Sequence, residues 1–220
     1  MAIESPQEEE GNRRDVHLFV VDTMADWEPA FAISHINRPA PGAPTRYRMR
    51  TVGLARRPIR SMGGLVVTPD MALSELAPNA SAMLILPGAD LWQEAVTDPV
   101  LAKACDFVEA GVPIAAICGA TFGLARAGLL DDRRHTSNDP HWLASSGYGG
   151  GACYVQEPAV EDRGIITASV TASLEFAQLI LARLEVFPNK ALDAWYRLYK
   201  TGSPACYLEL MEAFGHGDER

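Results

Sequence analysis

Long apolar runs, a signal-like segment and an excess of basic residues are all missing from this sequence of 220 residues. No run approaches the length of a membrane span, and the first residues are polar and acidic, so neither a membrane anchor nor export is expected. The formal net charge of −9 argues against nonspecific nucleic-acid binding and against anionic membrane surfaces. The sequence therefore indicates a cytoplasmic globular protein without nucleic-acid or membrane partners.

Cysteine is scarce, and its spacing excludes two classes of site. The four cysteines form no Cys-x-x-Cys pair and no metal-ligand spacing, so we expect free thiols and no metal. Cys105, Cys153 and Cys206 lie in apolar patterns and are interpreted as structural. The glycine-rich run 146–151 precedes an expected strand rather than a helix, which does not fit a phosphate loop. No cofactor is therefore expected.

Apolar periodicity predicts strands that alternate with helices. We expect a flexible tail over residues 1–13 and a single domain over 14–220 with helices at its C-terminal end. The expected strands cover 15–21, 47–53, 82–86, 112–117, 133–137, 152–156 and 165–169, with a hairpin over 57–68. The expected longer helices cover 28–36, 98–110, 119–128, 171–187, 189–200 and 204–214, and short ones follow 68–70 and 138–140. This order predicts an α/β fold, a flavodoxin-like three-layer sandwich with a mainly parallel central sheet.

The stretch VPIAAICGATFGLARAG, residues 112–128, indicates a buried strand that turns sharply into a helix. Cys118 falls in the turn, where unsatisfied backbone N–H groups and the helix dipole favour a thiolate, so its pKa is expected to fall. Gly119 allows the tight turn. From this local pattern alone, a nucleophile and a small buried hydrophobe are equally good readings of Cys118.

The carboxyl ends of three predicted strands meet at one edge of the sheet. After the first strand comes DTMADWE, which ends in Glu28; after the AMLIL strand comes PGAD, residues 87–90; after the IAAI strand comes Cys118. Together with LILPGAD, the motifs ADWEPA and AAICGATFGLARAGLLDDRRHTSN resemble the DJ-1/PfpI superfamily, also called ThiJ/PfpI or class I glutamine-amidotransferase-like. The resemblance covers about residues 15–187 and is strongest to bacterial members described as proteases or amidases.

The resemblance implies a role for each matching residue. Cys118 matches the reactive elbow cysteine, and Glu28 matches the acid that hydrogen-bonds its sulfur. Gly88 and Ala89 match a loop whose N–H groups form an oxyanion site with that of Gly119. Burial against a thiolate would raise the pKa of the Glu28 carboxyl and let it carry protons. Pocket-lining positions are expected at Trp27, Asp90, Trp92, Thr121 and Asn138, although the two tryptophans fit packing equally well.

The sequence departs from the family where a histidine is expected. Gly119 stands where the protease-like branch has histidine, and Asn138 stands where other branches have it. His135 should face away from Asn138, and His141 lies on the next helix; both are interpreted as structural. Without a His partner, the leaving amine of a peptide lacks a proton donor, which argues against peptidase activity.

Three functions remain open at this point. The first is a small-molecule cysteine hydrolase or glyoxalase-type lyase that uses Cys118 and Glu28. The second is a redox-responsive stress protein whose cysteine is oxidised to sulfinate without turnover. The third is a pure interaction module. Apolar residues near the C-terminal end, such as Leu208, Met211 and Phe214, indicate a homodimer surface and fit all three.

Overall fold

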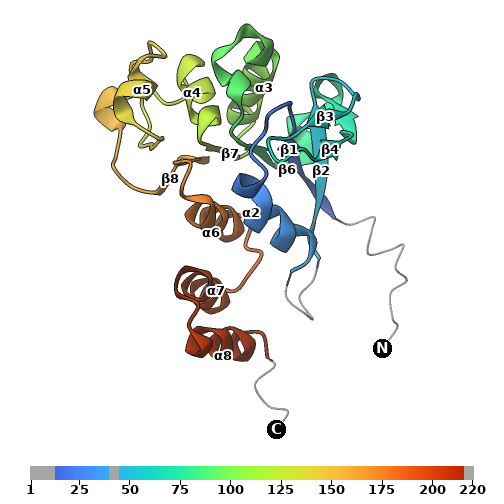
Figure 1. Cartoon of the computed structure of the whole chain (residues 1–220), viewed down its shortest axis with the longest axis vertical. Helices are drawn as coiled ribbons and strands as arrows, with labels where there is room; N and C mark the ends of the chain where they lie inside the picture. The colour runs from blue at the N-terminus through green and yellow to red at the C-terminus, as the bar shows by residue number, and fades with distance from the viewer. Residues whose placement is uncertain (1–12, 40–44, 216–220) are drawn as a thin grey trace.

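The central sheet has seven strands in the order β5-β2-β1-β6-β7-β9-β8 (Figure 1). The computed structural model describes residues 13–39 and 45–215, so the predicted tail lies outside these residues except for Arg13. All strand pairs in this sheet are parallel except β8 with β9. The strands of the sheet are β1 (Arg14–Phe19), β2 (Tyr47–Gly53), β5 (Met71–Ala72), β6 (Ser81–Leu86), β7 (Ile114–Ile117), β8 (Ala159–Asp162) and β9 (Ile165–Ala168).

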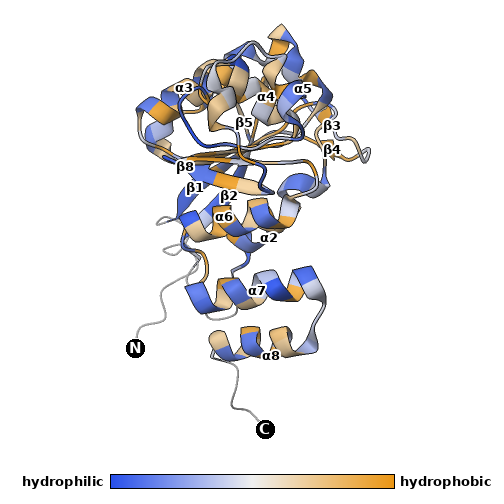
Figure 2. Ribbon diagram, turned by 90° about the vertical axis from the view of Figure 1, so that its left-hand side faces the viewer, coloured by the Kyte–Doolittle hydropathy of each residue, from blue (hydrophilic) through white to orange (hydrophobic). Residues whose placement is uncertain are grey.

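Helices cover both faces of the sheet. Helices α3, α4 and α5 lie on one face, whereas α2 and α6 lie on the other, with α7 and α8 stacked beyond them (Figure 2). The helices are α2 (Trp27–Asn37), α3 (Asp98–Glu109), α4 (Gly119–Arg126), α5 (Pro140–Ala144), α6 (Ser173–Arg183), α7 (Asn189–Thr201) and α8 (Pro204–Ala213). The short 3-10 helices are η1 (Leu73–Glu75), η2 (Pro78–Ala80), η3 (Asp90–Gln93), η4 (Ala95–Thr97) and η5 (Gly150–Cys153). The predicted three-layer, flavodoxin-like α/β sandwich is confirmed.

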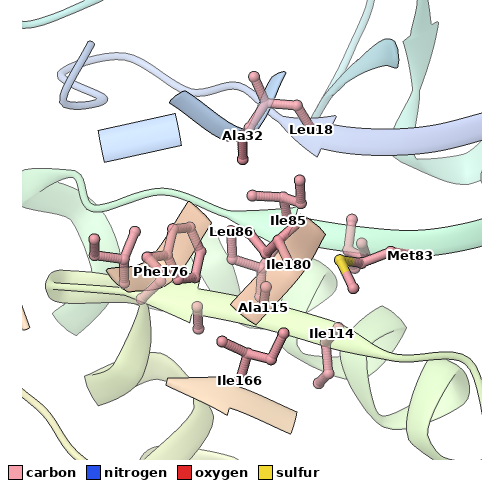
Figure 3. Packing of buried hydrophobic residues seen from close by; sticks show 14 of the residues in the cluster. Leu18, Ala32, Met83, Ile85, Leu86, Ile114, Ala115, Ile166, Phe176 and Ile180 are labelled. Atoms are coloured by element: carbon pink, nitrogen blue, oxygen red, sulfur yellow. The ribbon is translucent and has the colours of Figure 1, made fainter. Parts of the chain in front are cut away.

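The core lies on both faces of the two central strands. Every residue of β6 and β7 is buried, as expected for strands of a parallel sheet covered twice. On one side, Phe176 and Ile180 of α6 pack against this core (Figure 3). The carboxyl ends of β1, β6 and β7 are thereby fixed side by side, and the loops that follow them share one edge of the sheet.

The predicted hairpin over 57–68 is present as β3 (Ile59–Arg60) paired with β4 (Val66–Val67). It is fastened to the loop after β1, because Met62 N–H donates to the Met24 carbonyl at 2.9 Å and Gly63 N–H donates to Asp26 Oδ2 at 2.6 Å. The short α-helix expected after residues 68–70 is not formed. The chain first adds β5 to the edge of the sheet, and only then makes the single turn η1.

The region between α4 and β9 differs most from the prediction. The strand expected over 133–137 is reduced to a single bridge between His135 and Tyr154, and the strand expected over 152–156 is replaced by η5. Gly150 at the start of η5 must be glycine, since a Cβ there would lie 2.2 Å from the Leu130 carbonyl oxygen. The edge strand β8 forms only after this segment.

The helix expected over 171–187 is shorter than predicted. It ends at Arg183, and Glu185 then adopts a left-handed φ of 50°. Leu184 and Phe187 are nevertheless buried, which is why the apolar pattern runs past the end of the helix. None of the helices described for residues 13–39 and 45–215 has both the length and the apolar character needed to cross a membrane.

Candidate functional site

Cys118 lies in the turn between β7 and α4, with φ 57° and ψ −123°. Residues with a Cβ rarely adopt this conformation, which costs on the order of 1–3 kcal/mol. The surrounding hydrogen bonds hold it in place. Cys118 N–H donates to the Ala168 carbonyl at 3.0 Å, and Thr121 donates to the Cys118 carbonyl from both N–H and Oγ1 at 3.1 and 2.6 Å. The strained turn presents the half-buried sulfur at the edge of the sheet.

Glu28 reaches the sulfur from the first turn of α2 and is fully buried. Its Oε2 accepts a hydrogen bond from Gly88 N–H at 2.5 Å. Its Oε1 is buried without a hydrogen bond of good geometry among the described residues, while the Cys118 thiol is its polar neighbour. Because Gly88 N–H fixes Oε2 as an acceptor, a proton on Glu28 belongs on Oε1, on the side of the sulfur.

Gly88 is required by the closeness of this pair. A Cβ at position 88 would lie 2.7 and 2.9 Å from the Glu28 carboxyl oxygens and 2.8 Å from the Cys118 Cβ. Gly119 is enclosed as well, since its Cβ would meet the Ala89 carbonyl oxygen at 2.9 Å. The two glycines therefore let backbone approach the sulfur and the acid without a gap.

The Cys118–Glu28 pair titrates over an unusual range. Burial raises the pKa of Glu28 to about 7, although the hydrogen bonds from Gly88 and Cys118 act to lower it. Burial and the negative charge of Glu28 raise the pKa of Cys118 to about 11, although hydrogen bonds from Asn138 and Gly119 act to lower it. The predicted fall of the thiol pKa is wrong, because burial and a neighbouring carboxylate outweigh the helix start. Between the two values the pair shares one proton and one negative charge.

Asn138 is the second side chain that contacts the sulfur. Its Nδ2 donates to Cys118 Sγ at 3.3 Å, and its Oδ1 accepts from Val170 N–H at 2.8 Å. The side chain is exposed, so this contact lies at the open side of the sulfur.

The backbone donors around the site are not equivalent. Gly88 N–H already donates to Glu28, so it is not available as the oxyanion donor that the resemblance implied. Gly119 N–H donates towards the Cys118 sulfur. Ala89 N–H has no recorded acceptor in the described part of the chain. Ala89 N–H is therefore the donor left for an oxygen next to the sulfur, and Gly119 N–H would have to turn to that oxygen from the sulfur.

The other predicted pocket residues make no hydrogen bond to the sulfur among the described residues. Trp92 is buried, donates from Nε1 to the Pro87 carbonyl at 2.8 Å and packs on Phe19, which favours the packing interpretation of this residue. Thr121 is buried beneath the turn. Asp90 is exposed, and Trp27 is 47% exposed beside an open hollow of about 510 Å³ that Met62 and Leu65 also line.

None of the described histidines hydrogen-bonds to Cys118, and His135 and His17 hold structural positions. His135 is buried, and its ring nitrogens bond to the Arg133 carbonyl at 2.7 Å and to the Tyr148 hydroxyl at 3.0 Å. His17 bonds to the Ser81 hydroxyl at 2.9 Å inside the sheet. His141 is exposed on α5 and has no recorded bond to Cys118.

The sequence reasoning missed Ser137 as part of the site's support. Its hydroxyl donates at 2.6 Å to Thr121 Oγ1, whose own proton is given to the Cys118 carbonyl. The only hint was its place one residue before Asn138. Across residues 13–39 and 45–215, no group of three or more His, Cys, Asp or Glu residues is arranged to hold a metal ion.

Comparison with known proteins agrees with this architecture. The DJ-1/PfpI family profile matches residues 14–183. The chain is 41% identical over 202 residues to a Bacillus subtilis protein named uncharacterized protease YoaZ, covering 90% of this chain and 96% of that one. A ThiJ/PfpI family crystal structure from Bacillus anthracis superposes with a TM-score of 0.85 at 37% identity, covering 91% and 97% of the two chains. A DJ-1 superfamily structure from Agrobacterium tumefaciens gives a TM-score of 0.76 at 29% identity, covering 86% and 98%. The chain therefore belongs to the DJ-1/PfpI family.

Proposed function

We propose that this protein is a cysteine-dependent enzyme for small carbonyl compounds, and that its reaction is the glyoxalase-type conversion of a 2-oxoaldehyde and water into a 2-hydroxy acid. One observation carries the proposal: the fully buried Glu28 lies against the Cys118 thiol, and the two share a proton over a wide pH range. This is the arrangement that a nucleophile and a single proton carrier require.

The first step joins the sulfur to the substrate. The Glu28 carboxylate first takes the proton of the Cys118 thiol onto Oε1, and the resulting thiolate attacks the aldehyde carbon. The carbonyl oxygen becomes an oxyanion beside the Ala89 and Gly119 N–H groups. Glu28 then gives the proton on Oε1 to this oxygen. The product is a hemithioacetal, and Glu28 is left as a carboxylate.

The next steps move hydrogen within the substrate. Glu28 takes the proton from the former aldehyde carbon, giving an enediolate, and returns it to the neighbouring carbon, while the hydroxyl proton passes to the oxygen on that carbon. The result is a thioester of a 2-hydroxy acid, in which one carbon has been oxidised and the other reduced. Water, deprotonated by Glu28, attacks the thioester, the carbon–sulfur bond breaks and the thiolate is regenerated.

Peptide hydrolysis fits the site less well, although two relatives from Bacillus subtilis are named uncharacterized proteases. Cleavage of an amide requires a proton for the departing amine. No described histidine bonds to Cys118, so the proton donor of a Cys–His dyad is missing at the sulfur. Carbonyl addition needs no departing amine.

The test is a substrate panel of 2-oxoaldehydes, simple amides and peptides assayed with wild-type protein, Cys118→Ala and Glu28→Gln. We expect 2-hydroxy acid to form from oxoaldehydes and both variants to lose at least about 1,000-fold of the rate. Cys105→Ala, which removes a thiol from a helix elsewhere, should match the wild type. No turnover of any oxoaldehyde, or turnover that survives in Cys118→Ala, would overturn the proposal.

A second candidate is a redox role for the same sulfur. Two hydrogen-bond donors, protonated Glu28 and Asn138 Nδ2, face Cys118 and could hold the oxygens of a sulfinate. Two molecules of peroxide would convert the thiol to sulfinic acid and release two of water. Mass spectrometry after mild peroxide treatment should then show two added oxygens on Cys118 before Cys105, and equal resistance of both thiols would exclude this role.

We also propose a cytoplasmic homodimer. The four cysteines are free thiols, as in a reducing compartment. On α8, Tyr207 and Leu208 are 51% and 50% exposed, and a second copy would cover them. Sedimentation of wild type and Leu208→Asp tests the assembly, since the variant should sediment as a monomer.

A further inference from the structure

Asn138 is held at the sulfur by contacts on both sides of it in the chain. On the N-terminal side, Ser137 bonds to Thr121 Oγ1 at 2.6 Å, and Thr136 N–H donates to Thr167 Oγ1 at 2.9 Å. On the C-terminal side, Asp139 caps α5 by accepting from Trp142 N–H at 2.8 Å. These bonds fix the backbone of residues 136–139, so an exposed side chain has a defined position.

The amide itself has a defined orientation. Val170 N–H can only donate, so the atom of Asn138 that faces it at 2.8 Å must be the oxygen. The amino group is thereby turned towards Cys118 Sγ at 3.3 Å. An amide does not titrate in the range where proteins fold, so this donor is present whether the sulfur is a thiol or a thiolate.

We propose that Asn138 is a positioning residue that orients the Cys118 sulfur and favours its anionic form, and that it leaves Glu28 as the sole proton-exchanging side chain in contact with the sulfur among the described residues. The effect of Asn138 on catalysis rests on the proposed function, whereas its effect on the nucleophilicity of the sulfur does not. With Asn138 unable to exchange protons, Glu28 carries every proton of the reaction. A single proton carrier suits the transfer of hydrogen between adjacent carbons of one substrate.

Three variants separate the donor from the space it fills. Asn138→Asp has nearly the same shape and still accepts from Val170 N–H, but it turns an acceptor towards the sulfur. Asn138→Leu removes the donor at similar volume. Asn138→His places a titratable donor near the sulfur. Ser137→Ala is the matched control, because it loosens the same segment without removing the sulfur's donor.

The readout is the pH dependence of Cys118 alkylation by iodoacetamide, followed by mass spectrometry of the Cys118 peptide. We expect the alkylation rate at pH 8 to fall about tenfold in Asn138→Leu and further in Asn138→Asp, because loss of a hydrogen bond to the thiolate raises the pKa of the sulfur, and one pKa unit is about 1.36 kcal/mol. Asn138→His should add a second inflection near neutral pH. Ser137→Ala should shift the midpoint less than Asn138→Leu does, because it loosens the segment but keeps the donor.

Two results would overturn the inference. One is an alkylation profile of folded Asn138→Leu that coincides with that of the wild type. The other is an equal shift in Ser137→Ala, which would assign the effect to the segment rather than to the amide. Alkylation needs no substrate, so an enzyme inactive on every oxoaldehyde would refute the proposed function while this test still decides the role of Asn138.

Discussion

Helix α2 carries an ionisable side chain near each end, and burial shifts the pKa values of the two side chains in opposite directions. Burial raises the pKa of Glu28 in its first turn and lowers the pKa of His35 in its last turn. Both shifts favour the neutral form, since a low dielectric disfavours charge of either sign. The difference lies in what each neutral group contacts.

His35 bonds to a residue of another helix. Its Nε2 accepts from Trp195 Nε1 at 2.8 Å, and since an indole nitrogen can only donate, this atom of His35 carries no proton. The rings of Trp195, Tyr199 and Phe187 surround it at centroid distances of 5.2, 6.2 and 5.4 Å. The contact joins α2 to α7, and it is a structural one.

Glu28, by contrast, has one oxygen bonded to Gly88 and one left towards Cys118. A buried polar atom without a good partner costs about 1–3 kcal/mol, which folding tolerates only where another group requires it. The comparison indicates that the bond of His35 joins two helices, whereas Glu28 leaves one buried oxygen facing the sulfur, as the proposed proton transfer requires.

The largest expected effect comes from Glu28→Gln. The wild-type carboxyl has its pKa raised from 4.5 to about 7, so the unfolded chain loses this proton first as pH rises, and stability falls between those values. The amide cannot ionise, and it can still accept from Gly88 N–H. Urea unfolding at pH 8 should therefore show the variant more stable by about 3 kcal/mol, although inactive, with no difference below pH 4.

Glu109→Gln is the matched control for this test, because Glu109 is exposed at the end of α3. It should unfold like the wild type at both pH values. Equal stability of Glu28→Gln and wild type at pH 8 would contradict the prediction that ionisation of Glu28 destabilises the folded protein.

A smaller effect is expected from Gly88→Ala. The new methyl group would lie within 2.9 Å of both Glu28 and Cys118, so the pair must separate at a cost of about 1–3 kcal/mol. Turnover should be lost, and thermal unfolding should begin at a lower temperature. Gly151→Ala has nothing within 4 Å of its added Cβ and should leave both measurements unchanged; a tolerated Gly88→Ala would show that the close contact is dispensable.

Apolar periodicity was sufficient to predict the sandwich because the sequences of the central strands are almost entirely apolar, which indicates that these strands are buried. All residues of β6 and β7 are apolar apart from Ser81, and β6 ends at the loop that contains Gly88. The strands expected over 133–137 and 152–156 were mispredicted, whereas the short helix expected after 138–140 is present as α5. Between the two, Gly150 lies so close to the Leu130 carbonyl that only glycine fits, a contact that periodicity does not reveal.

The site was only partly accessible to sequence reasoning. The turn at Cys118 could be predicted from local pattern, but the nearness of Glu28, 90 residues away in sequence, came from the family resemblance. The thiol pKa was predicted in the wrong direction, because the helix start is local whereas burial and the Glu28 charge arise from the fold. The two interpretations of Trp92 could not be separated for the same reason, since nothing in PGADLW shows which way the indole turns.

The smallest expected effect comes from His35→Gln, which tests the structural role of the second ionisable side chain of α2. Because burial lowers the pKa of His35 below 6.5, the unfolded chain binds the proton first on acidification, so this stability is present above pH 6.5 and is lost as pH falls. Glutamine can accept from Trp195 without titrating. Its unfolding free energy should then vary less between pH 7 and 5, by at most about 1.4 kcal/mol per pH unit. The exposed His141→Gln should keep the wild-type slope; if both histidine variants flatten the slope alike, His35 is not the buried neutral acceptor that joins α2 to α7.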